Sequence, residues 1–131
     1  MRLWIVVALV LFSGCKPSVS DLRAQYAKEK EKLGEREKAL LEFDRFKVDL
    51  AGQERIQKAD VDKVEQSLAE SGADRQDRKY EDDQKYVATQ RESLAEADHI
   101  VDETRAKLVA EVEDQRRKVA EVEAQLKKAQ R

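Results

Sequence analysis

Ser71-Gly72-Ala73-Asp74 separates two long segments of the chain, each of which carries its own heptad repeat of apolar residues. Glycine is favoured just past the end of a helix, and aspartate is favoured at the cap that starts one. These four residues therefore predict a tight turn at 71–74 between a helix at 20–71 and a helix at 74–131. Helices of near-equal length around a short turn favour an antiparallel hairpin.

The heptad repeats define one apolar seam on each side of this turn. In the first seam, the a positions are Tyr26, Leu33, Leu40, Val61 and Leu68, and the d positions are Leu22, Phe43, Leu50 and Val64. In the second, the d positions are Tyr80, Val87, Leu94, Val101, Leu108 and Val122, and the a positions are Val112, Val119 and Leu126. Tyr80 comes two residues too late to continue the first register. The sequence thus predicts an all-α coiled coil at 20–131 with a change of register at the turn.

Pairing residues whose numbers sum to about 148 places a positions opposite d positions, as antiparallel packing requires. This pairing matches apolar residues near both ends of the hairpin, but in the middle it sets Leu50 opposite Asp98 and Phe43 opposite Arg105. Five further apolar residues lie off the seams: Leu41, Phe46, Val48, Ile56 and Ile100. They are either scattered exposed residues, which are common, or a contact surface for a second copy or another coiled-coil envelope protein.

The first residues of the chain have the organisation of an export signal. Arg2 precedes an apolar run from Leu3 to Phe12, and Ser13-Gly14-Cys15 follows, with the one cysteine of the chain. The run would form a helix of only about 15 Å, roughly half the thickness of a bilayer core. It is therefore too short for a comfortable permanent membrane span. Lys16–Val19 is predicted as a polar tether, with Ser20 as the cap of the first helix and Asp21 in its first turn.

Phe12-Ser13-Gly14-Cys15 resembles the lipobox of bacterial lipoprotein precursors, although that pattern usually has leucine where this chain has Phe12. The resemblance implies that 1–14 is a signal peptide cleaved between Gly14 and Cys15. It also implies that Cys15 carries acyl chains such as palmitate, and that 15–19 is a lipidated tether. Lys16 after the cysteine resembles the class sorted to the outer membrane, which implies a lipid-anchored protein of the cell envelope facing the periplasm.

Charge and composition exclude several classes of function. Charged residues make up 41% of the chain, and 26 basic residues balance 28 acidic ones without forming a basic block, so nucleic acid is not expected as a partner. A two-helix rod holds no water-restricted pocket, so we expect neither catalysis, a small-molecule substrate nor a cofactor. His99, between Asp98 and Asp102, is expected to be an exposed helical residue and not a metal ligand. Four pairs are expected to stabilise the helices: Glu103–Lys107, Glu113–Arg117, Asp114–Lys118 and Glu123–Lys127.

Three hypotheses follow. The first is a coiled-coil lipoprotein that is anchored to the bilayer through Cys15 and serves as a structural or adaptor component. The second is one nearly continuous helix in a parallel multimer, similar to Braun's lipoprotein, although the C-terminal lysine of that family is replaced here by Arg131. The third is a surface lipoprotein that binds an external or host molecule or excludes an incoming machine.

Overall fold

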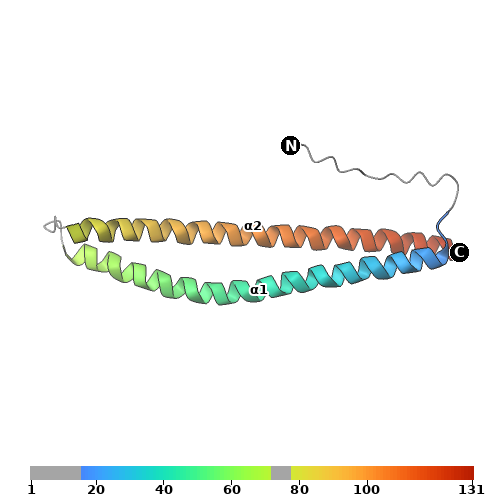
Figure 1. Ribbon diagram of the computed structural model, residues 1–131, viewed down its shortest axis with the longest axis horizontal. Helices are drawn as coiled ribbons and strands as arrows, with labels where there is room; N and C mark the ends of the chain where they lie inside the picture. The colour runs from blue at the N-terminus through green and yellow to red at the C-terminus, as the bar shows by residue number, and fades with distance from the viewer. Residues whose placement is uncertain (1–15, 72–77) are drawn as a thin grey trace, which may run out of the picture.

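The computed structural model describes residues 16–71 and 78–131, which form two antiparallel helices packed side by side (Figure 1). Helix α1 spans Val19–Glu70 and helix α2 spans Arg78–Ala129, with 52 residues in each. At 1.5 Å per residue, each helix is about 78 Å long. The start of α1 lies beside the C-terminus (Figure 1). The predicted all-α hairpin is confirmed, and the alternative of one continuous helix is wrong.

The cap of α1 differs from the prediction by two residues. Ser18, and not Ser20, is the N-cap, and its side-chain oxygen accepts a hydrogen bond from the backbone N–H of Asp21 at 3.1 Å. The Asp21 carboxylate in turn accepts from the backbone N–H of Ser18 at 3.2 Å. This reciprocal capping box outcompetes Ser20 because it satisfies two backbone donors at once. The tether between Cys15 and the helix is therefore Lys16–Ser18.

The other helix ends agree with the prediction only in outline. Helix α1 ends at Glu70, and Ser71 donates from both its backbone N–H and its hydroxyl to the carbonyl oxygen of Ser67. Gly72 and Asp74, to which we assigned the turn, lie outside the described residues. The described part of α2 begins at Arg78 and ends at Ala129, so the last two residues are not helical.

The observed register of the hairpin matches the predicted pairing. Side chains in contact across the helices include Gln57 with Gln90 and Lys47 with Asp102, whose residue numbers sum to 147 and 149. Side chains at the seam are most deeply buried toward the two ends of the rod. The buried apolar residues are Leu22, Val112 and Val122 toward the end with the tether and the C-terminus, and Val61 and Val87 toward the turn.

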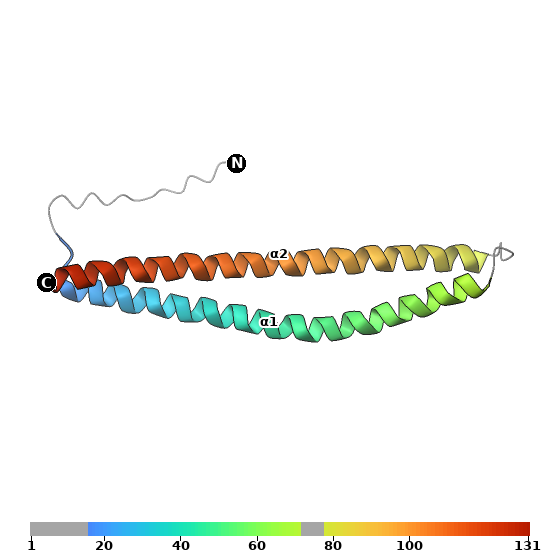
Figure 2. The same ribbon diagram turned by 180° about the vertical axis from the view of Figure 1, so that it is seen from behind.

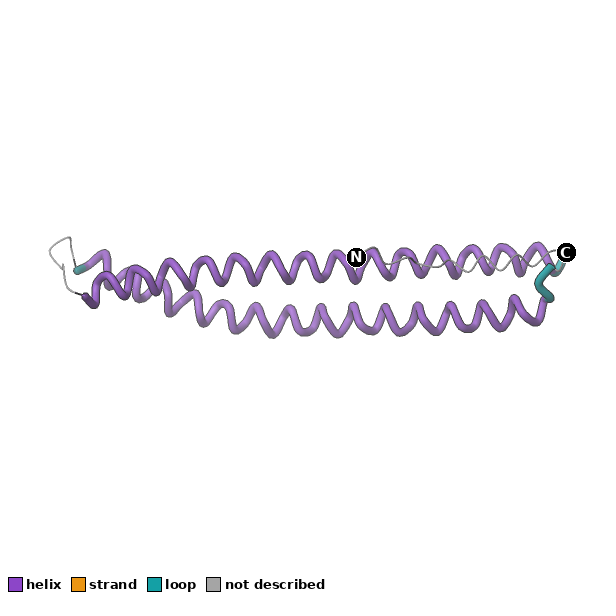
Figure 3. The backbone as a smooth tube through the Cα atoms, turned by 45° about the horizontal axis from the view of Figure 1, so that its top comes forward, coloured by secondary structure: helices purple, strands orange, loops and turns teal. Residues whose placement is uncertain are grey.

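The middle of the hairpin is less closely packed than its ends. Helix α1 bows away from α2 over its central part, as seen from both sides (Figures 1 and 2). In a tilted view, the two helices run along the whole length of the rod (Figure 3). Apolar seam residues in this region stay half-buried: Leu33, Leu40, Phe43, Leu50, Leu94, Val101 and Leu108. The poorly matched central pairing predicted above explains this, because charged side chains occupy the seam positions between these residues.

Candidate functional site

The residues predicted to be cleaved and lipidated, Gly14 and Cys15, lie outside the described residues. The chain immediately after them is described and lies against the far end of α2. Lys16, Pro17 and Leu22 line a surface pocket together with Gln125, Lys128 and Ala129. The tether and the C-terminal end of α2 therefore meet at one end of the rod.

The five residues predicted as a contact surface are all exposed. Leu41, Phe46, Val48, Ile56 and Ile100 each have more than half of their surface accessible to solvent. They do not lie on one face of the hairpin, however. Tyr86, which is 43% exposed, belongs with them and was missed by the sequence analysis. Its signal was available, because Tyr86 lies next to the seam residue Val87 and off the seam itself.

Heptad positions define two edges of the hairpin, which we call the e flank and the g flank. On α1, the e positions include Glu37, Asp44 and Glu65, and the g positions include Lys32, Phe46 and Asp60. On α2, the e positions include Asp102, Val109 and Arg116, and the g positions include Gln90, Thr104 and Lys118. In an antiparallel pair, e residues meet e residues along one edge, and g residues meet g residues along the other.

The ion pairs between the two helices all use the e flank among the described residues. Each joins an e residue of one helix to a charged residue at an a or e position of the other, and Arg91 reaches Asp62 in addition. These pairs are Lys47–Asp102 at 2.9 Å, Asp44–Arg105 at 2.8 Å, Glu37–Arg116 at 2.9 Å and Arg91–Glu65, with Arg91–Asp62 at 3.1 Å. Lys47, Arg91 and Arg105 occupy a positions that an apolar side chain would fill in a regular coiled coil. By reaching the e flank, these three bases escape burial in the seam.

The same pairs shift the acidity of their members. The Arg105 guanidinium donates hydrogen bonds to Asp44 and holds the pKa of that carboxyl below its ordinary value. Lys47 lowers the pKa of Asp102 in the same way, first through its hydrogen bond and then through its charge. All these side chains are substantially exposed, so the carboxylates remain ionised and solvated at neutral pH.

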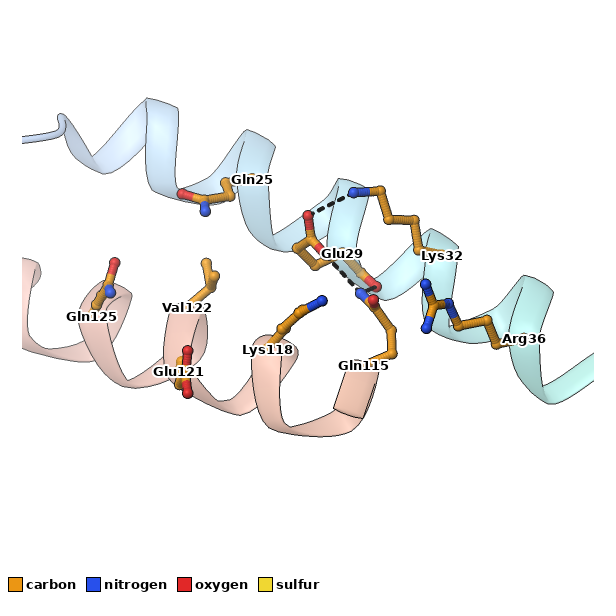
Figure 4. Close-up of a pocket in the computed structure, with 9 residues that line it drawn as sticks. All are labelled: Gln25, Glu29, Lys32, Arg36, Gln115, Lys118, Glu121, Val122 and Gln125. Atoms are coloured by element: carbon orange, nitrogen blue, oxygen red, sulfur yellow. Dashed lines mark hydrogen bonds and ion pairs between the residues drawn. The ribbon is translucent and has the colours of Figure 1, made fainter. Parts of the chain in front are cut away.

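On the g side of the seam, the contacts between the described parts of the helices are hydrogen bonds and not ion pairs. Gln57 donates to Gln90, and Arg36 donates to the backbone carbonyl oxygen of Glu111 at 3.0 Å. Gln115 is buried and donates to Glu29, beside a polar surface pocket between the helices that includes Lys32 (Figure 4). Toward the centre of the rod, this flank has no charged g position from Ala39 to Gln53 on α1 or from Gln90 to Thr104 on α2.

The exposed apolar residues divide between the two flanks. Phe46 is a g residue, and Ile56, Tyr86 and Ile100 occupy c positions, which lie next to g on a helix surface. Leu41 and Val48 occupy b positions, which lie next to e. The predicted contact surface is thus two separate surfaces, and the larger one lies along the g flank, from its uncharged centre toward the acidic g positions near the turn.

Comparison with known proteins gives no family to guide this assignment. No family model, curated protein or solved structure matches the chain. The site must be interpreted from its own chemistry.

The one histidine of the chain lies on α2. His99 is exposed, and its Nε2 lies 3.7 Å from Glu103 Oε1. Within 16–71 and 78–131, no cluster of three or more metal-ligating side chains occurs. Neither described helix combines the length and the apolar character needed to cross a bilayer.

The local ion pairs partly follow the prediction. Asp114–Lys118 and Glu123–Lys127 form at 2.9 and 2.8 Å, as expected for the i,i+4 spacing. The other two predicted pairs do not form, because their acids find other partners. Glu103 approaches His99, and Glu113 contacts Arg116 at 2.9 Å, a residue that also reaches across to α1.

Proposed function

We propose that this chain is a lipid-anchored coiled-coil lipoprotein of the bacterial cell envelope, a structural or adaptor component that works through protein–protein contacts. Cys15 would carry acyl chains, palmitate among them, and would hold the rod on the outer membrane, facing the periplasm. The supporting observation is the position of the helix start. Helix α1 begins at Val19, so only Lys16–Ser18 separate Cys15 from a rigid rod.

A tether of three residues spans at most about 10 Å when fully extended. A lipid on Cys15 would therefore hold the first turn of α1 close to the headgroups, and the hairpin would extend about 78 Å from that point. Its contact surfaces near the middle would then be presented at a fixed range of distances from the bilayer. Such an arrangement suits a spacer or an adaptor.

Basic residues at the same end of the rod also support this proposal. Lys127 and Lys128 lie in the last turn of α2, and Lys128 lines a pocket with Lys16. Basic groups near a bilayer are attracted to anionic lipid headgroups, at roughly 1 kcal/mol for each residue close to the surface. An acyl anchor next to a basic cluster combines two signals for membrane association.

The proposal is tested by following the full-length chain in a bacterial host grown with labelled palmitate. We expect the natural chain to take up label, and Cys15→Ser to take up none and to retain residues 1–14, whose apolar run can itself associate with membranes. Lys16→Gln is the matched control, because it removes a charge beside Cys15 without removing the acceptor thiol. Unlabelled natural protein, or labelling that persists in Cys15→Ser, would contradict the proposal.

A further inference from the structure

The g flank leaves the middle of the apolar seam uncovered. Each helix of a two-helix rod covers its partner from one side only, so seam residues stay open to solvent along the edges. Phe43 is half-buried, and its ring lies 6.2 Å from the exposed ring of Phe46 on the g flank, centroid to centroid. The seam thus continues onto the surface at Phe46, without a charged g residue beside it.

The charges on the g flank are unevenly distributed along the rod. Toward the end with the tether and the C-terminus the flank has Lys32 on α1 and Lys118 on α2, with Glu111 as the one acid of this part, and toward the turn it has Asp60 and Asp83. Lys32 and Asp60 stand at equal distances, 14 residues, on either side of Phe46. Lys118 and Asp83 are likewise centred between Ala97 and Thr104. The two centres fall at nearly the same height of the hairpin, within two residues in the observed register.

We propose that two copies of this chain pack antiparallel along their g flanks and form a four-helix bundle, with Phe46 of both copies at the two-fold axis. Reversing one copy end for end brings its Asp60 to the Lys32 of the other, and its Asp83 to the other's Lys118. Ala97 then faces Thr104, and Glu111 faces Gln90. Closed two-fold pairing of one surface with itself is the commonest form of self-association.

A parallel pair of hairpins is disfavoured by the same charges. In that arrangement α1 of one copy lies over α2 of the other, which places Lys32 near Lys118 and Asp60 near Asp83. Like charges would then face each other at both ends of the interface. The antiparallel pair replaces each of these repulsions with an attraction.

The flank is also large enough for a stable contact. It is about 78 Å long and about 20 Å wide, the width of two helices. A standard stable interface needs roughly 800 Å² from each partner. The antiparallel pair further places the two Cys15 ends at opposite ends of the bundle, so that it joins two facing membrane surfaces or lies along one.

The proposed dimer would supply a partner for the adaptor role proposed above. It rests on that role for its contact surface, but dimer formation does not require the lipid. Sedimentation of the full-length chain carrying Cys15→Ser in mild detergent therefore tests it separately from palmitate labelling. We expect a dimer that Phe46→Glu dissociates at least tenfold more readily. Val48→Glu is the matched control, because Val48 is even more exposed but lies beside the e flank.

Exchanging the charges of Lys32 and Asp60 distinguishes an antiparallel from a parallel dimer. In an antiparallel dimer, Lys32→Glu and Asp60→Lys should each raise the dissociation constant by roughly tenfold, and the double variant should restore it, since opposite charges again face each other. In a parallel dimer, each single variant would instead tighten binding, because it relieves a like-charge contact. Tightening, or a double variant weaker than both single variants, would overturn the antiparallel arrangement.

Disulfide formation gives a second, geometric measurement in the Cys15→Ser background. Ala39→Cys and Gln53→Cys lie at equal distances from Phe46, so a mixture of the two variants should cross-link between copies. Neither variant should cross-link with itself, because identical positions are about 21 Å apart along the axis of an antiparallel pair. A natural chain that sediments as a monomer at high micromolar concentration, or self-linked Ala39→Cys, would overturn the proposal.

Discussion

The side-chain amide of Gln115 donates hydrogen bonds to both the backbone carbonyl oxygen and the carboxylate of Glu29, at 2.9 and 2.6 Å. Gln115 is 1% exposed and is the one buried polar residue among those described. It occupies a d position of the second seam, where an apolar residue would be usual. A slip of α2 by one helical turn would bury this amide without its partner, so the pair favours one register of the hairpin.

Two substitutions of Gln115 should affect the stability of the hairpin and its register differently. Gln115→Ala should lower the free energy of unfolding by roughly 1–3 kcal/mol, because the packing and the hydrogen bonds are lost together. Gln115→Leu should leave it within about 1.5 kcal/mol of the natural value or raise it, but it should permit slipped pairings. Spin labels at positions 31 and 117, with Cys15→Ser, measure this. A distance distribution that stays as narrow in Gln115→Leu as in the natural chain would contradict the prediction.

Glu54 is a seam position at which a substitution should stabilise the hairpin. One of its carboxylate oxygens is buried and has no hydrogen-bond partner among the described residues, and it lies in a surface pocket beside Leu94. Glu54→Leu should raise the free energy of unfolding by about 1–3 kcal/mol, since an unsatisfied polar atom is replaced by apolar contact. Urea denaturation measures the change. Glu31→Leu, at an exposed position, should shift stability by less than about 0.5 kcal/mol, and an equal gain in both variants would argue against a specific role for Glu54.

The capping box assigns different effects to two neighbouring serines. Ser18→Ala should cost about 1 kcal/mol, because the backbone donor of Asp21 loses its acceptor. Ser20→Ala should cost much less, since the hydroxyl of Ser20 bonds to the hydroxyl of Ser18, at 2.9 Å, and not to a backbone donor of the first turn. Thermal unfolding of the two variants decides the matter. A larger loss of stability in Ser20→Ala would identify Ser20 as the N-cap, as the sequence predicted.

Acid should weaken the ion pairs of the e flank. The pKa values of Asp44 and Asp102 are lowered in the folded state by their hydrogen bonds to Arg105 and Lys47. A carboxyl group with a depressed folded pKa stabilises the fold above its unfolded pKa, near 4, and this contribution is lost as the pH falls through the lower folded value. The melting temperature should therefore fall between about pH 4.5 and pH 2. Double replacement with Asp44→Asn and Asp102→Asn should flatten this acid limb, whereas Asp49→Asn with Asp98→Asn should not.

The architecture could be predicted from the sequence because the heptad repeat determines which side chains face the partner helix. Tyr26, Phe43 and Tyr80 lie at the half-buried seam positions that were predicted, and the register of the hairpin follows the expected pairing. Helix ends were less accurate. Ser18 and Ser20 are equally good caps by composition, and only the position of Asp21, three residues after Ser18, distinguishes them.

The division of the surface into two flanks was not predicted. The five off-seam residues were grouped because all are apolar, whereas their heptad letters separate Leu41 and Val48 from Phe46, Ile56 and Ile100. The letters were available in the sequence. What it did not supply was the edge to which Lys47, Arg91 and Arg105 would turn, since long basic side chains at a positions can reach either side of a seam.

The concentration of buried side chains at the two ends of the rod has a consequence for its dynamics. Helices ordinarily fray from their ends, but here Leu22 and Val122 are buried toward one end, and Val61 and Val87 are buried toward the other, on either side of a bowed middle. Backbone amides near Phe46 should therefore exchange with deuterium sooner than those near Val61, an inverted protection profile. If protection from exchange near Phe46 increases with protein concentration, a second chain binds to the middle of the rod.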